Sequence, residues 1–188
     1  MCRYIINKNC LEQGLKKDWD RRFKKFSGKS RVWKIRYYLS RPQYKTLFYY
    51  RLYLASARFI KPFFHWLYSR NSLKSGVEFN LQKLGGGIII PHWGRIILNA
   101  HSIGENFYVF HNVTVGNNYT SGKPVIGNNV LVGTGSTILG DITIGDNVII
   151  GANSFVNSDT PSNVIIAGSP AKVIKNIEPD AINKLIGY

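Results

Sequence analysis

The feature that most constrains this chain is a six-residue repeat of aliphatic side chains in its second half. Gly follows many of these aliphatics and Asn or Asp stands nearby, so turn-forming residues recur with the same period. One inward aliphatic and one tight corner per unit predict short flat strands that stack coil on coil in a parallel β-helix. Ten aliphatics share the register: Ile97, Ile103, Val109, Val115, Ile126, Val132, Ile138, Ile144, Ile150 and Val156.

The period breaks once, between Val115 and Ile126, which are eleven residues apart instead of six. Asn117 to Pro124 are therefore predicted to leave the coil as a protruding loop. Ordered loops on a rigid scaffold often carry function. An insertion without a role at an exposed corner is the alternative, because lengthening a loop costs little free energy.

Charge and aromatic content divide the chain near Ser75. The first 75 residues hold 19 Lys and Arg against three acids, and 17 of the 25 aromatic residues. The rest is nearly neutral and aliphatic. We therefore expect a basic, aromatic, helical segment over 1–75, a β-helix domain over 76–176, and a short C-terminal helix or tail over 177–188.

The basic segment, which we call the leader, allows two interpretations. Its apolar stretch should not span a bilayer, because each Arg or Lys near the centre would cost about 2.5–3.5 kcal/mol. On a helix between Pro42 and Pro62, the cations Arg51, Arg58 and Lys61 would fall within an arc of about 80°. Such a basic face suits an anionic membrane surface. Helices packed on the β-helix, with solvated cations, explain the composition equally well.

The cysteines and the absence of certain motifs indicate where the protein resides and which partners it binds. Cys2 and Cys10 both lie in the leader, and no secretory signal pattern is present, so we expect a reduced, cytoplasmic protein, with the leader available to the inner face of the cell membrane. No nucleic-acid partner is expected, since the basic residues form no recognised binding motif.

Residues 87–175 resemble the hexapeptide-repeat acyltransferases, most closely their serine acetyltransferase branch. The resemblance rests on Gly-Ile-Ile-Ile-Pro-His, His-Asn-Val-Thr-Val-Gly, Ile-Gly-Ala-Asn-Ser-Phe-Val and Ala-Gly-Ser-Pro-Ala-Lys. It implies a left-handed β-helix of four to five coils, a hand that strand physics alone does not supply. It also implies acetyl-CoA as the acyl donor, no metal, and a homotrimer with active sites between neighbouring β-helices.

Acetyl transfer from a thioester to an alcohol needs a base, and a histidine with its ordinary pKa of ~6.5 suits that role. His92, in Ile-Pro-His-Trp-Gly, matches the family's catalytic histidine. The spacing places His111 beside it on the next coil, either in the site or on a surface without a role. The resemblance aligns Glu78 with the carboxylate that orients the histidine, although the connecting segment is one residue shorter. His65 and His101 are expected to be structural.

The acceptor site departs from the serine acetyltransferase pattern at two positions. Pro91 stands where the family has an acid, and Lys123 replaces a second active-site histidine. A site without the acid should bind the serine ammonium poorly, so we expect a sugar hydroxyl of a surface polysaccharide or O-antigen. Asn117 and Asn118 are expected near the acetyl group. Serine O-acetyltransferase of cysteine biosynthesis and a non-catalytic β-helix scaffold remain the alternatives.

For coenzyme A, the resemblance implies a groove of small residues between two subunits and lysines that meet the phosphates. The glycines alone would be explained by turn geometry, so the prediction depends on the Ala-Gly-Ser-Pro-Ala-Lys segment as well. The predicted coenzyme-binding residues are Gly133, Thr134, Gly151, Ala152, Gly168, Lys172 and Lys175.

Overall fold

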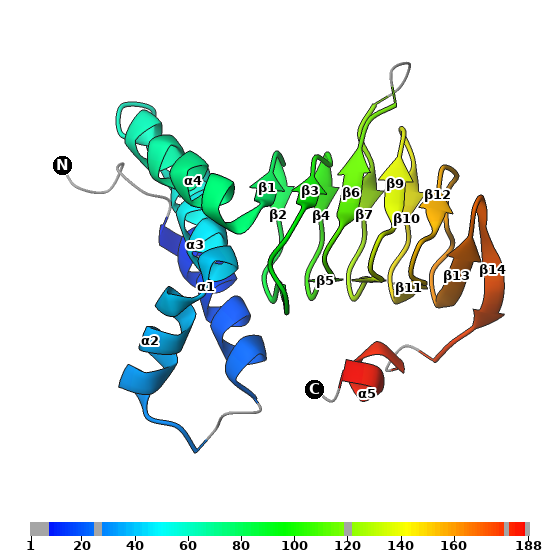
Figure 1. The fold of residues 1–188 in the computed structure, drawn as a ribbon, viewed down its shortest axis with the longest axis horizontal. Helices are drawn as coiled ribbons and strands as arrows, with labels where there is room; N and C mark the ends of the chain where they lie inside the picture. Colours follow the sequence, from blue (N-terminus) through cyan, green and yellow to red (C-terminus); the bar gives the residue numbers. More distant parts are fainter. Residues whose placement is uncertain (1–7, 25–27, 119–121, 179–180, 187–188) are drawn as a thin grey trace.

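The computed structural model describes residues 8–24, 28–118, 122–178 and 181–186. Four helices stand at one end of a row of short parallel strands, and a final short helix lies beside that row (Figure 1). The chain is therefore mainly β, a parallel β-solenoid preceded by helices, as the repeat predicts.

The leader forms four helices: α1 (Lys8–Phe23), α2 (Arg31–Ser40), α3 (Pro42–Ala55) and α4 (Lys61–Ser75). The Ser30 side chain caps α2 by accepting a hydrogen bond from the Trp33 amide. Gly76, with φ of 65°, ends α4 and directs the chain into the solenoid. The prediction of one helix between Pro42 and Pro62 was wrong, because α3 ends at Ala55 and α4 begins at Lys61.

The solenoid strands form three sheets, with strand orders β1-β3-β6-β9-β12, β10-β7-β4-β2 and β14-β13-β11-β8-β5. Among the described strands, all pairs are parallel except β13–β14, which is antiparallel. Helix α5 (Ala181–Ile186) follows the last strand. The strands are β1 (Val77–Phe79), β2 (Lys83–Leu84), β3 (Ile96–Leu98), β4 (Ser102–Ile103), β5 (Tyr108–Val109), β6 (Val113–Gly116), β7 (Val125–Ile126), β8 (Leu131–Val132), β9 (Thr137–Leu139), β10 (Thr143–Ile144), β11 (Val148–Ile150), β12 (Phe155–Val156), β13 (Val164–Gly168) and β14 (Ala171–Asn176).

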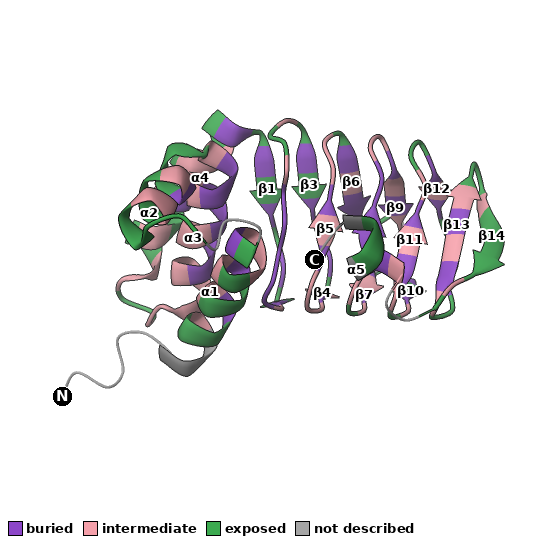
Figure 2. Ribbon diagram, turned by 90° about the horizontal axis from the view of Figure 1, so that it is seen from below, coloured by how far each residue is buried: buried purple, intermediate pink, exposed green. Residues whose placement is uncertain are grey.

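Nine of the ten repeat positions are buried inside the coils, and Figure 2 shows buried residues in purple along the strands. Ile97 is the exception, and its predicted inward position was wrong, because its side chain is 40% exposed. Ile96 and Leu98 point inward instead, and Leu98 pairs with Val115 in the next coil. The inward column therefore passes through Leu98, five residues before Ile103.

One corner of the solenoid carries a column of asparagines. Asn106, Asn129, Asn147 and Asn163 all have positive φ, between 53° and 63°. Each carboxamide donates to the next along the column, with N···O distances of 2.9, 3.0 and 2.9 Å. Asparagine tolerates this backbone conformation better than most residues, so the column fixes the same turn in successive coils.

A buried ion pair attaches the leader to the first coil. Asp18 of α1 accepts from Arg51 of α3 at 2.6 and 3.0 Å, and from the Ile88 amide at 2.8 Å. Arg51 also donates to the Gly85 carbonyl at 2.6 Å. Burial raises the pKa of the Asp18 carboxyl above its ordinary value, while Arg51 and the Ile88 amide oppose that rise.

The burial of Arg51 corrects the expected basic face, because its guanidinium does not lie on the exposed surface with Arg58. Within the described part of the chain, no helix is both long enough and apolar enough to cross a membrane.

Candidate active site

His92 and His111 lie together at the solenoid corner where the chain enters β3 and β6. Their ring centroids are 6.0 Å apart and the rings are nearly perpendicular. The spacing of the repeat predicts this proximity. The two imidazoles line an open cavity of about 400 Å³ whose other walls are Arg41, Gln43, Pro91 and Trp93. The cavity therefore joins the first coils to the N-terminal end of α3.

The cavity has a cationic and aromatic character. None of the described residues that line it is acidic, whereas Arg41 and the two histidines all carry or can carry positive charge. Trp93 follows the candidate base and leaves 55% of its surface exposed. The cavity thus offers a flat apolar surface beside His92, and no carboxylate to pair with a ligand ammonium.

Two buried polar atoms in this cavity have no hydrogen-bond partner among the described residues: Oε1 of Gln43 and Nδ1 of His111. The Gln43 side chain is 2% exposed, and its Nε2 donates to the Ile90 carbonyl at 3.4 Å. Buried polar atoms in folded proteins are normally paired. An unpaired donor or acceptor in a cavity is thus a natural contact for a ligand.

Glu78 lies outside this cluster. It lines a second cavity of about 750 Å³, between α3, α4 and β1, with residues that include His65 and Tyr68. Among the described residues no hydrogen bond or ion pair joins Glu78 to His92, so its orienting role stays a prediction. His65 lies against Tyr53 with ring centroids 5.3 Å apart, and His101 is exposed at another corner.

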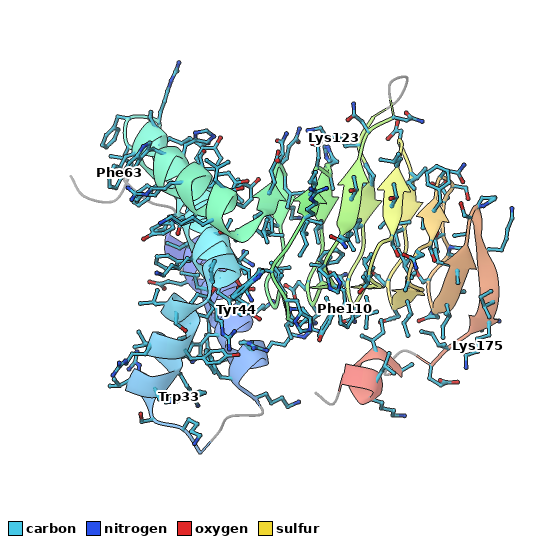
Figure 3. The ribbon with its side chains drawn as sticks, viewed as in Figure 1. Trp33, Tyr44, Phe63, Phe110, Lys123 and Lys175 are labelled. Carbon is cyan, nitrogen blue, oxygen red and sulfur yellow. The ribbon has the colours of Figure 1, made fainter. Side chains whose placement is uncertain are left out.

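The loop residues lie at the opposite end of strand β6 from the histidines. His111 precedes β6 by two residues, whereas Asn117 and Asn118 directly follow it and are exposed. Figure 3 shows Lys123 and Phe110, the neighbour of His111, at opposite edges of the solenoid. Residues 119–121 of this loop lie outside the described residues. A single chain therefore does not bring Asn117, Asn118 and Lys123 to His92.

The residues predicted for coenzyme A continue the corner of His111 toward the C-terminal end, because Gly133 and Thr134 lie between β8 and β9, which stack on β5 and β6. Gly133 stacks on the next coil so closely that an added Cβ would lie 2.6 Å from the Ala152 amide nitrogen. Packing between coils thus requires this glycine. Thr134, Gly151 and Ala152 are partly or fully exposed, as are Gly168, Lys172 and Lys175 on β13 and β14. Small exposed residues and two lysines could hold a pantetheine arm and its phosphates, and their role stays a prediction.

The hexapeptide solenoid has counterparts among known proteins. Residues 123–158 match the family model described as bacterial transferase hexapeptide (six repeats). The match covers a limited part of the chain but coincides with the most regular coils.

Among individual proteins, the chain is similar to serine acetyltransferases. It is 39% identical over 127 residues to the serine acetyltransferase of Synechococcus elongatus, covering 58% of this chain and 52% of that protein. The chain thus spans about half the length of this relative. Two solved structures are each 25% identical: serine acetyltransferase in complex with coenzyme A from Brucella abortus strain S19 (TM-score 0.71, 89% of this chain and 68% of that one), and soybean serine acetyltransferase complexed with serine (TM-score 0.72, 88% and 70%). These matches confirm the predicted resemblance.

Sequence reasoning did not identify Arg41, Gln43 and Trp93 as part of the site. Trp93 had a usable signal, because it adjoins His92. Arg41 and Gln43 precede His92 by about 50 residues and belong to no repeat, so only the packing of α3 on the first coils brings them there.

Proposed function

We propose that this protein is an acetyl-CoA-dependent O-acetyltransferase that uses His92 as general base and a sugar hydroxyl as acceptor. The observation that carries the proposal is the His92–His111 pair, which opens into a cavity at the corner of a hexapeptide solenoid. The similarity to acetyltransferases, one of them solved with coenzyme A, supports the donor and the class of reaction.

The reaction follows from the chemistry of the groups. His92 takes the proton of the acceptor hydroxyl as its oxygen attacks the thioester carbonyl carbon. The resulting oxyanion needs hydrogen-bond donors, and the amides of Asn117 and Asn118 are the proposed source. Collapse breaks the carbon–sulfur bond, and the leaving thiolate takes the proton from His92. The products are an acetyl ester and free coenzyme A.

The cavity favours a sugar over an amino acid. Pro91 stands at its wall where the serine-specific pattern has an acid, and Arg41 adds positive charge. A ligand ammonium would therefore lack a carboxylate partner, which disfavours its transfer from water. The exposed Trp93 ring, in contrast, offers a surface that suits the apolar face of a sugar ring. We place the acceptor in surface polysaccharide or O-antigen synthesis.

Serine O-acetyltransferase is the second candidate, and the comparisons favour it over the sugar acceptor, because the relatives carry that name. An amide oxygen such as that of Gln43 could accept from an ammonium, and Arg41 could bind a carboxylate. A non-catalytic scaffold is disfavoured by the histidine pair and its cavity.

A homotrimer would complete the site. Asn117, Asn118 and Lys123 lie at the far end of β6 from His111, so a neighbouring β-helix has to present its own loop to the histidines. Cyclic packing of three copies meets this requirement. Light scattering during size-exclusion chromatography should give the mass of three chains. A monomer with full activity would contradict the shared site.

Peripheral membrane contact is proposed for α4. Phe63, Trp66 and Leu73 are exposed on this helix, and Figure 3 shows Phe63 at its end away from the solenoid. No acidic residue occurs between Asp20 and Glu78, so the surroundings of this apolar surface attract anionic lipid. The fraction of protein that sediments with vesicles containing phosphatidylglycerol should be lower for Phe63→Ser than for the parent. With vesicles of phosphatidylcholine alone, the two proteins should sediment equally.

The deciding experiment offers acetyl-CoA with serine, nucleotide sugars and polysaccharide repeat units in parallel. Thiol release reports turnover, and mass spectrometry identifies the acetylated product. Acetylation of a sugar supports the proposal. Acetylation of serine alone would assign the second candidate, and no turnover with any acceptor would favour the scaffold.

A further inference from the structure

The orientation of the Gln43 carboxamide is determined by its surroundings. Its Nε2 donates to the Ile90 carbonyl, a group that can only accept. The reversed amide would place two acceptor oxygens against each other, so Oε1 is the atom left unpaired. Gln43 is 2% exposed, and it lies on α3, outside the repeat. The leader therefore contributes a buried, unpaired acceptor to the catalytic cavity.

His111 contributes the complementary atom. Its Nδ1 is buried without a partner among the described residues, in the same cavity as Gln43. A neutral imidazole carries its proton on one nitrogen, so Nδ1 can donate when His111 adopts that tautomer. Leaving two such atoms unpaired costs free energy, which a ligand that pairs both would recover.

A hydroxyl group can pair with both atoms at once, because it donates one hydrogen bond and accepts others. An ammonium only donates, so it could satisfy Gln43 but could not accept from an Nδ1–H of His111. The 6.0 Å separation of the ring centroids lets the two histidines reach oxygens on neighbouring carbons of one sugar ring.

We propose that Gln43 and His111 together bind a second hydroxyl of the acceptor, adjacent to the hydroxyl that His92 deprotonates. The substrate class is then a vicinal diol of a sugar, and Gln43 makes the leader a part of the acceptor site. The inference deepens the proposed function and rests on His92 as its base.

The first experiment compares acceptors within one variant. Gln43→Met removes the amide at nearly constant volume, and Gln13→Met makes the same change at an exposed position of α1. The acceptors are methyl glycosides and their deoxy analogues that lack the neighbouring hydroxyl. Gln43→Met should lower kcat/KM by about tenfold for the intact glycoside and leave the deoxy analogue unchanged. Gln13→Met should match the parent with both. A general folding defect would lower both acceptors equally.

The second experiment does not need turnover. The imidazole resonance of His111, assigned by its loss in His111→Phe, should shift on addition of a methyl glycoside to the parent and not to Gln43→Met. If the protein acetylates no glycoside but this Gln43-dependent shift occurs, the proposed function fails and the binding site stands. If it acetylates glycosides while Gln43→Met affects intact and deoxy acceptors alike, the function stands and this inference is overturned. Absence of any shift in the parent also overturns it.

Discussion

Replacing Asp18 by Ala should destabilise the protein strongly, because the change leaves a buried guanidinium without its counter-ion. Asp18 and Arg51 are 1% and 5% exposed and are joined by two hydrogen bonds of 2.6 and 3.0 Å. Removing one partner of such a pair costs about 3–5 kcal/mol. Arg51 retains the Gly85 carbonyl, while the Ile88 amide loses its acceptor. We therefore expect a loss within this range.

Urea unfolding followed by circular dichroism measures the free energy of unfolding. Asp20→Ala, on the exposed side of the same helix, is the matched control and should change it by less than about 0.5 kcal/mol. The double variant Asp18→Leu with Arg51→Met should be more stable than Asp18→Ala, because it leaves no unpaired charge buried. An Asp18→Ala protein as stable as the Asp20→Ala control would refute the argument that this pair attaches the leader to the solenoid.

Three further outcomes follow from the site and the coils. His92→Ala should reduce acetyl transfer by about 10²–10⁴-fold in the thiol-release assay, and His101→Ala, at an exposed corner, should not; retention of most activity in His92→Ala would exclude His92 as the base. Asn129→Ala should lower stability by about 1–3 kcal/mol more than Asn112→Ala, since both have positive φ but only Asn129 makes two contacts in the asparagine column; equal thermal unfolding of the two variants would contradict this. Lys172→Ala with Lys175→Ala should raise KM for acetyl-CoA several-fold, less so at high salt, and an unchanged KM relative to Lys184→Ala would remove both lysines from the coenzyme site.

The sequence predicted the solenoid well because its signal is periodic and local. Each inward aliphatic repeats the same environment, so nine of the ten positions were identified. Ile97 failed because three aliphatics follow one another at residues 96–98 and the preceding coil has a different length. Val77 pairs with Ile96 nineteen residues later, whereas Ile96 pairs with Val113 after seventeen. The choice among three aliphatics therefore depended on a register that no local pattern specifies.

The leader was predicted less completely, since its contacts join residues distant in sequence. Arg51 was assigned to an exposed basic face from helical geometry, but Asp18 neutralises it inside the protein. Gln43 enters the cavity for the same reason, because α3 packs across the first coils. Helical periodicity places residues on faces, but the partner that covers a face is decided by tertiary packing.

The two ends of the solenoid limit its growth. A parallel stack presents unpaired carbonyls and amides at its first and last coils, where a second molecule could add and extend a fibre. At the first coil, Arg51 donates a hydrogen bond to the Gly85 carbonyl and Arg21 donates one to the Gly87 carbonyl. At the last coil, β14 reverses direction against β13 and exposes Lys172 and Lys175 (Figure 2). We therefore expect the helical leader to oppose end-to-end polymerisation, and a chain cut back to residue 76 should expose a surface that can assemble with itself.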